Sequence, residues 1–118
     1  MKEETEEDSF FVQFLGGSSF IRVLDYLISN DAYDCSIQDI AEGTELARNT
    51  ISRVLAEMET RGIAKHVRNI GMAKMYQLNR NDTFVKRLIQ LDLSLSRDHA
   101  NRVVEEIRGT RKSQMLVH

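Results

Sequence analysis

The polar side chains between residues 48 and 56 have the clearest capacity for chemistry in this sequence. The segment reads RNTISRVLA, and in a helix one face would carry Arg48, Asn49, Ser52, Arg53 and Ala56. Arginine and asparagine can form paired hydrogen bonds with the edges of guanine and adenine, and serine can bond to either base. Together with the neighbouring Thr50, this face is therefore a candidate for contacts with nucleic-acid bases.

The residues around this segment predict two helices joined by a turn. Ser36 is expected to cap a helix over residues 37–42, with Asp39 at its positive end, and Gly43-Thr44 are expected to break it. A second helix is expected from about Ala47 until Gly62, and its apolar residues share one face at three- and four-residue steps: Ile51, Val54, Leu55 and Met58. Because Ala47 offers no side-chain oxygen, Thr44 or solvent would have to accept from the free amides. This is the pattern of a helix-turn-helix whose second helix fits a DNA major groove.

A scaffold helix and a hairpin are expected on either side of these two helices. Ser18 or Ser19 would cap a helix that ends at Asn30-Asp31, and residues 32–35 could add an edge strand. Residues 63–70 and 73–78 flank Gly71-Met72 and are typical of a β-hairpin. Its expected core-facing residues are Ile63, Val67, Tyr76 and Leu78, and its expected outward-facing residues are Lys65, Arg68, Asn69 and Lys74. Residues 63–78 are expected to complete the core.

The two ends of the chain suggest self-association. Residues 1–9 are acidic and are expected to form a disordered tail, whereas residues 10–15 are densely apolar and would form a strand or short helix in the core or against a second subunit. A helix beginning at Asn81 or Asp82 is expected to reach about Arg108, followed by a flexible end over residues 109–118. This helix could fold back on the domain or pair with a second copy, and its length favours pairing. The expected dimer interface comprises Phe11, Phe14, Phe84, Leu88, Leu91 and Leu95, the last four at heptad-like steps.

Charge and composition narrow the function classes. The 118 residues carry a net charge of −2, yet residues 46–80 hold seven basic and two acidic side chains, a local charge of +5. This favours a polyanion partner, although ordinary solvated faces would also explain it. The sequence has no nucleophile beside a base, no phosphate loop, no cofactor or metal motif and a single cysteine, Cys35, so we expect neither an enzyme nor a metal site. No apolar run approaches the ~20 residues of a membrane span, and we expect a cytoplasmic protein without a membrane partner.

Residues 18–79 resemble the winged helix-turn-helix domain of small prokaryotic transcriptional regulators, the broad group that includes the multiple-antibiotic-resistance and arsenic-repressor types. The resemblance is carried by SIQDIAEGTELARNTISRVLAEMETRGIAKHVRNIGMAKMYQL, residues 36–78. It implies an α+β fold, mainly α with a small β-hairpin and a long C-terminal helix. Residues 10–80 would form the DNA-binding domain and residues 81–108 a dimerisation helix. The paired cysteines of the arsenic-repressor type are absent, so metal sensing is not implied, and no effector is indicated.

The resemblance also assigns roles to the polar residues. The major groove would be faced by Arg48, Asn49, Thr50, Ser52 and Arg53. The adjacent backbone phosphates would be contacted by Ser36, Gln38 and Thr44. The hairpin would reach the minor groove or its phosphates through Arg68, Asn69 and Lys74. The expected function is a sequence-specific, homodimeric regulator that binds double-stranded DNA. The alternative is a winged-helix module that binds protein and not DNA.

Overall fold

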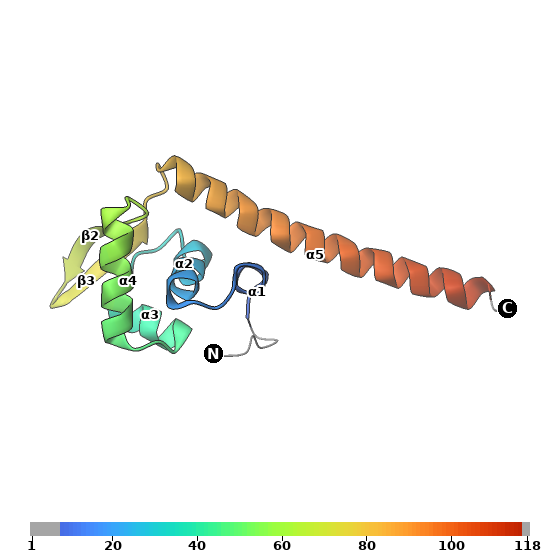
Figure 1. Cartoon of the computed structure of the whole chain (residues 1–118), viewed down its shortest axis with the longest axis horizontal. Coiled ribbons are helices and arrows are strands. Elements are labelled where there is room, and N and C mark those ends of the chain that lie inside the picture. The colour runs from blue at the N-terminus through green and yellow to red at the C-terminus, as the bar shows by residue number, and fades with distance from the viewer. Residues whose placement is uncertain (1–7, 117–118) are drawn as a thin grey trace.

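The computed structural model describes residues 8–116, and in the last helix it describes side chains only up to Arg108. The elements follow the order α1 (Phe10–Leu15), α2 (Ser19–Ser29), β1 (Cys35–Ser36), α3 (Ile37–Thr44), α4 (Arg48–Thr60), β2 (Ala64–Ile70), β3 (Ala73–Leu78) and α5 (Thr83–Leu116). Figure 1 shows α1 to α4 and the hairpin gathered at one end, while α5 projects far beyond them, so that the longest dimension is 67 Å. The fold is mainly α with a small sheet and a long C-terminal helix, as the sequence predicted.

Serine hydroxyls cap both N-terminal helices. Ser9 accepts a hydrogen bond from the Val12 amide, and Ser18 accepts one from the Ile21 amide. Of the expected tail over residues 1–9, residues 1–7 lie outside the described part, but Asp8 is bound to Arg22 at 3.0 Å and Ser9 belongs to the folded domain. Residues 10–15 form the short helix α1, and the Phe11 side chain is 0% exposed. Phe11 is therefore a core residue, and its expected place at a dimer interface is wrong.

Helix α3 begins as predicted but ends later. Ser36 and Asp39 form a reciprocal capping box: the Ser36 hydroxyl accepts from the Asp39 amide, and the Asp39 carboxylate accepts from the Ser36 amide. The chain turns at Glu45, which is left-handed with φ of 61°, and not at Gly43. Gly43 lies inside the helix, and the ring of Tyr26 packs against it. A Cβ at this position would lie 2.6 Å from Cδ2 of that ring. The glycine permits close packing of α3 on α2.

Helix α4 begins and ends where its sequence predicted. Its N-cap, Ala47, has no side-chain hydrogen bond, and its buried side chains are the four expected ones, Ile51, Val54, Leu55 and Met58. At the other end Gly62 has a φ of +73° and donates to the Glu59 carbonyl, while Ile63 donates to the Met58 carbonyl. These two bonds make a Schellman motif, which satisfies the last carbonyls of the helix and directs the chain into β2.

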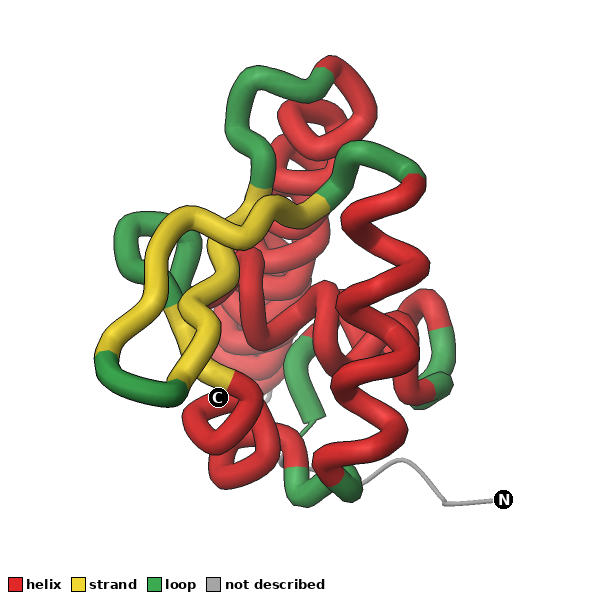
Figure 2. Tube along the Cα trace, turned by 90° about the vertical axis from the view of Figure 1, so that its left-hand side faces the viewer, coloured by secondary structure: helices red, strands yellow, loops and turns green. Residues whose placement is uncertain are grey.

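The hairpin forms a three-stranded antiparallel sheet with β1, in the order β1-β3-β2 (Figure 2). Ile63, Tyr76 and Leu78 are buried as predicted, but Val67 is half-exposed. The register shifts between His66 and Arg68, so Val67 is the extra residue of a β-bulge. Its side chain therefore does not point into the core as strand alternation predicts. Met75 is buried in the sheet instead.

The first half of α5 packs on its own domain. Asp82 caps the helix by accepting from the Val85 amide at 3.0 Å, and Val85 is 0% exposed in the core. Leu88, Leu91 and Leu95 are partly buried against the core, whereas Phe84 is 55% exposed. The fold-back alternative therefore applies to this half, and residues 63–78 alone do not complete the core. The helix continues to Leu116 and does not end at Arg108, because Gly109 is an interior residue that a helix tolerates.

The described helices show no candidate for a membrane span. None of them combines the length and the apolar character that crossing a bilayer requires.

Candidate nucleic-acid interface

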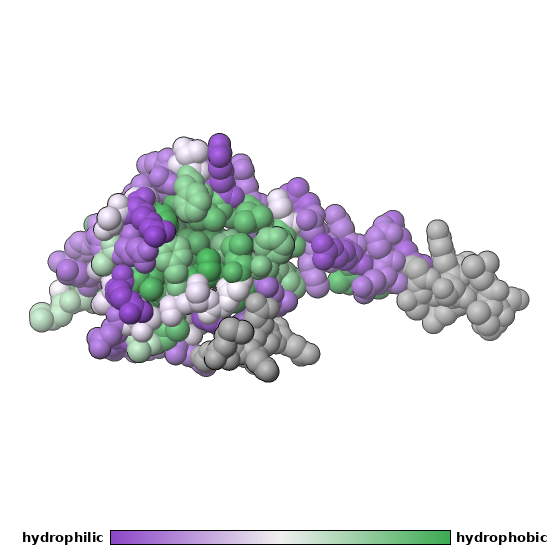
Figure 3. Space-filling model, in the orientation of Figure 1, coloured by the Kyte–Doolittle hydropathy of each residue, from purple (hydrophilic) through white to green (hydrophobic). Residues whose placement is uncertain are grey.

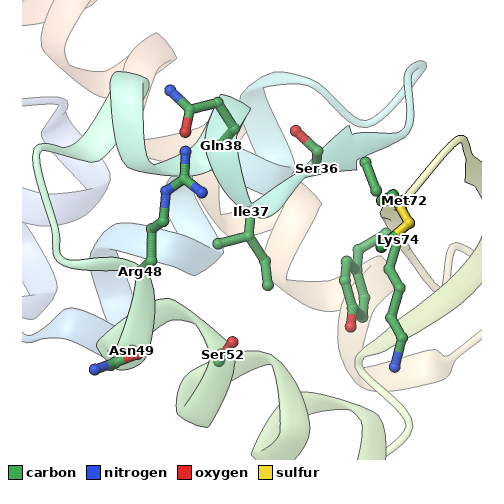
Figure 4. A pocket seen from close by; sticks show the side chains of 10 residues that line it. Ser36, Ile37, Gln38, Arg48, Asn49, Ser52, Met72 and Lys74 are labelled. Carbon is green, nitrogen blue, oxygen red and sulfur yellow. The ribbon is translucent and has the colours of Figure 1, made fainter.

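A groove of about 630 Å³ lies between α3, the start of α4 and the tip of the hairpin (Figure 4). Its walls bring together six of the residues that the sequence assigned to DNA: Ser36, Gln38, Arg48, Asn49, Ser52 and Lys74. Four further residues complete the lining: Ile37, Met72, Ala73 and Tyr76. Three separate elements of the chain therefore meet at one concave surface.

Helix α4 presents its N-terminal polar face to this groove. Arg48, Asn49 and Ser52 are exposed, and within the described part of the chain no hydrogen bond or ion pair engages them. Figure 4 shows Arg48 extending toward Gln38, with the Ser52 side chain one turn further along α4. Because Ala47 leaves the first α4 amides without a side-chain acceptor, this end of the helix has both backbone donors and a positive dipole available.

Two other predicted contacts on α4 and one before it lie outside the groove lining. Arg53 is exposed and Thr50 is half-buried, but neither residue lines the groove. The Thr44 hydroxyl donates to the Ile40 carbonyl at 2.6 Å and accepts from the Leu46 amide at 3.3 Å. Thr44 thus fastens the turn after α3, and it does not supply the cap of α4.

The α3 side chains at the groove already have partners within their own helix. The Ser36 hydroxyl belongs to the capping box, and Gln38 donates to the Glu42 carboxylate at 2.7 Å. Ile37 lies between them and the α4 face in Figure 4. This wall is therefore held in place by local bonds before any ligand arrives.

The hairpin residues divide into two groups. Lys74 lines the groove, whereas Arg68 is bound through two bonds to Asp34 in the loop before β1. The hydrogen bond from Arg68 holds the pKa of Asp34 below its usual value, and the same pair raises the pKa of Arg68. Asn69 pairs with the His66 ring at 2.6 Å. The structure thus places Lys74 with the α4 residues and leaves Arg68 and Asn69 outside the groove lining.

The charge around the groove is positive. Arg48, Arg53 and Lys74 lie at or beside it, and the hairpin strands contain no acidic residue. The two acidic residues of α4, Glu57 and Glu59, lie toward its far end, where Glu57 binds Arg61 at 2.6 Å. On the α3 wall, Asp39 and Glu42 are bonded to the lining residues Ser36 and Gln38, so the positive charge of the groove comes from the α4 and hairpin sides, which suit a phosphate-rich ligand.

Sequence reasoning missed the contribution of the hairpin turn. The sequence predicts Met72 only as part of a turn, yet it lines the groove and is fully exposed. Its position between two predicted strands was the available signal, because a hairpin turn beside a recognition helix must lie at the edge of any shared surface.

Of the titratable groups with raised pKa values, Tyr76 lines the groove, and burial raises the pKa of its phenol. Burial raises the pKa of the Cys35 thiol and of the neighbouring Tyr26 phenol, and it also raises the pKa of Asp25 and Asp92. Within the described residues, no group of three or more His, Cys, Asp or Glu side chains is placed to hold a metal ion.

Comparison with known proteins agrees with this geometry. Residues 21–68 match the family model of the IclR helix-turn-helix domain. A search of curated proteins found no significant match. The matched segment contains α3 and α4, which form two walls of the groove, but it ends within β2, before the hairpin residues that line the third wall.

Solved structures share the fold at low sequence identity. MepR, a transcription regulator of the Staphylococcus aureus multidrug efflux pump MepA, is 19% identical, with 88% of this chain and 75% of that chain covered and a TM-score of 0.62. A mutant of MepR bound to an oligodeoxyribonucleotide is 18% identical, with 90% and 79% covered and a TM-score of 0.61. A MarR family regulator from Silicibacter pomeroyi is 17% identical, with 78% and 60% covered and a TM-score of 0.55.

The resemblance read from residues 36–78 is thus confirmed at the level of the fold and its domain type. The chain has the winged helix-turn-helix fold, and within it residues 21–68 match the helix-turn-helix domain of the IclR type.

Proposed function

We propose that this chain is a sequence-specific regulator that binds double-stranded DNA as a homodimer and acts in the cytoplasm. The observation that carries the proposal is the groove in which the exposed face of α4 meets the hairpin, with Arg48, Asn49 and Lys74 on its walls. Its donors are fixed on a helix and a strand, its charge is positive, and its residue types are those that bond to bases and phosphates. Residues 10–80, with the start of α5 completing the core, form the DNA-binding unit in this proposal.

In the proposed complex, α4 occupies the major groove and the hairpin, as the wing, follows the adjacent backbone or minor groove. Arg48, Asn49, Ser52 and Arg53 are the base-contacting side chains, with Thr50 at the edge of that face. Ser36, Gln38 and the turn at Thr44 approach phosphates. Lys74 is the principal wing cation, and Arg68 and Asn69 would reach DNA only if their present partners, Asp34 and His66, released them.

The homodimer rests on apolar side chains that the described part of the chain leaves uncovered. Phe14 is 67% exposed and Phe84 is 55% exposed. On the projecting part of α5, Val103, Val104 and Ile107 are also exposed, in a stretch that reaches past the winged domain (Figure 1). A second copy would cover these residues, with Leu88, Leu91 and Leu95 contributing the edges that the core leaves open. Two-fold symmetry would then present two α4 helices to half-sites about 34 Å apart.

A mobility-shift titration on the DNA upstream of the chain's own coding sequence tests the proposal. The full chain should shift this duplex in the presence of excess random duplex, at a stated salt concentration, because specific binding typically exceeds non-specific binding by about 10³-fold or more. If a mass of random duplex equal to that of the upstream duplex abolished the shift, sequence specificity would be contradicted. No shift on any duplex, with retained binding to a protein partner, would support the protein-interaction alternative instead.

A further inference from the structure

The wing tip, which comprises Ile70, Gly71, Met72 and Ala73, is apolar and exposed. Met72 has a relative exposure of 103% and Ile70 of 52%, and Gly71 makes the turn with a φ of +59°. In Figure 3 the turn end of the hairpin, at the far left, is pale green among purple neighbours. An apolar side chain held this far into solvent has no role in the core of its own domain.

The charged side chains of the wing lie behind this tip. Arg68 is bound to Asp34, and the Lys74 side chain lies along the wall of the groove. The foremost part of the hairpin therefore offers a methionine and an isoleucine, and its nearest cation, Lys74, stands two residues behind Met72.

The tip is continuous with the groove on which the proposed function rests. Met72, Ala73 and Lys74 line it together with Arg48, Asn49 and Ser52 of α4, and Figure 4 shows Met72 and Lys74 side by side across from the α4 side chains. A duplex that brings its major groove to α4 would therefore bring its backbone to Lys74 and the next minor groove to Met72.

We infer that the wing tip is an apolar contact for the minor groove, with Met72 inserting against the base pairs at one step of the flanking duplex. Apolar side chains inserted from the minor groove partly unstack a base step, and the cost is lowest at flexible pyrimidine–purine steps. The inference rests on the proposed function. It gives the wing a preference for duplex sequences that deform easily, and this preference does not depend on hydrogen bonds to bases.

The test uses the full chain and a duplex that the wild-type protein has itself selected from a random library. Met72→Gln keeps the length of the side chain and removes its apolar end, and Met72→Leu keeps the apolar end. Val67→Ala is the matched control, because Val67 is a half-exposed apolar residue of the same hairpin that does not line the groove. Thermal unfolding of all variants confirms that each is folded.

We expect Met72→Gln to weaken binding about 10-fold, Met72→Leu to bind within about 2-fold of wild type, and Val67→Ala to bind like wild type. The slope of log affinity against log salt should be the same for all four proteins, because no charge is removed. A fluorescent base analogue that brightens on unstacking, moved along the flank, should brighten at one step with wild type and not with Met72→Gln. Replacing that step by a stiff A-tract should reduce wild-type affinity and leave Met72→Gln unchanged.

Equal affinity of Met72→Gln and Val67→Ala for the selected duplex would overturn the inference and leave the proposed function intact. Failure of the wild-type chain to select any duplex would overturn the proposed function itself. Loss of binding of Met72→Gln to vesicles of anionic phospholipid, with DNA binding unchanged, would make the tip a lipid contact and would also overturn the inference.

Discussion

The guanidinium of Arg68 donates two hydrogen bonds to the carboxylate of Asp34, from Nε to Oδ2 at 2.5 Å and from Nη2 to Oδ1 at 3.2 Å. The pair joins the outer strand of the wing, β2, to the loop between α2 and β1. Gln77 of β3 donates to the Asp31 carbonyl in the same loop. Because a two-point pair fixes the orientation of a guanidinium, Arg68 is directed to this loop and does not line the groove.

Asp34→Ala should therefore strengthen binding to a selected duplex. The substitution removes a negative charge beside the wing and releases Arg68 for a phosphate, so affinity at low salt should rise by about 2- to 5-fold and the salt slope should steepen by about 1. Fluorescence anisotropy titrations at several salt concentrations measure both quantities. Asp98→Ala, an exposed aspartate on α5, is the control and should change neither. Weaker binding by Asp34→Ala would show that the pair serves instead to hold the wing in position.

Asp25→Asn should stabilise the fold at neutral pH. Burial raises the pKa of Asp25, with smaller contributions from Asp92 and Asp8, while the hydrogen bond from Ser9 at 2.8 Å opposes the shift. A carboxyl group whose folded-state pKa is raised stabilises the fold most below its unfolded value of about 4, and this contribution falls as pH rises through the folded-state pKa. The melting temperature of Asp25→Asn should exceed that of wild type at pH 7, and the difference should vanish near pH 3. A lower melting temperature at pH 7 would mean that the hydrogen bond from the Ser9 hydroxyl to the Asp25 carboxylate stabilises the fold by more than the burial of that carboxylate destabilises it.

Gly43→Ala should destabilise the domain by about 1–3 kcal/mol, although alanine is the better helix former. The added Cβ would overlap the Tyr26 ring, which cannot swing away because it packs between α2 and α3. Urea unfolding gives the free-energy change. Gly17→Ala is the matched control, since the added Cβ there would meet only the far end of the Arg22 side chain. Equal costs for the two substitutions would indicate that α3 can shift away from Tyr26.

Ile107→Glu should separate the proposed dimer without unfolding the domain. Ile107 lies on the exposed projecting part of α5 with Val103 and Val104, and a charge there would be buried unpaired in any helix pair. Sedimentation at micromolar concentration should show a dimer for wild type and a monomer for Ile107→Glu. DNA affinity should fall toward that of a single half-site. Arg102→Glu on the same stretch is the control, and a wild-type monomer at this concentration would refute the dimer.

The local signals of the sequence predicted the helix-turn-helix well. The Ser36 cap with Asp39 in the first turn, the apolar face of α4 and the stop at Gly62 depend on neighbours within a few residues, and all three are confirmed. The errors depend on contacts distant in sequence. The local sequence predicts a helix break at Gly43, whereas the structure keeps Gly43 inside α3, where it accommodates the Tyr26 ring of another helix, α2.

The side of α5 that packs on the core, and the bonding partners of the wing residues, could be determined only from the three-dimensional structure. The residue that anchors α5 in the core is Val85, whereas Phe84 points outward, a difference of one position that no heptad pattern decides. The bulge at Val67 and the pairing of Arg68 with Asp34 likewise depend on strand register and on a loop 34 residues away. Residues 36, 38, 48, 49, 52 and 74, which the sequence predicts to contact DNA, nevertheless line one groove, and their contact with DNA stays a prediction.

A comparison of two arginines of the same helix tests directly whether this groove recognises DNA. Arg48 opens α4 at the groove, whereas Arg61 lies at the other end, about 20 Å away along the axis, over the Phe20 ring and bound to Glu57. Arg48→Ala and Arg61→Ala should be titrated with the selected duplex and with random duplex, after both variants are shown to be folded. We expect Arg48→Ala to lose about 1–3 kcal/mol on the selected duplex and much less on random duplex, and Arg61→Ala to bind both like wild type. Equal losses for the two arginines, or a loss confined to Arg61→Ala, would contradict the assignment of this groove to DNA recognition.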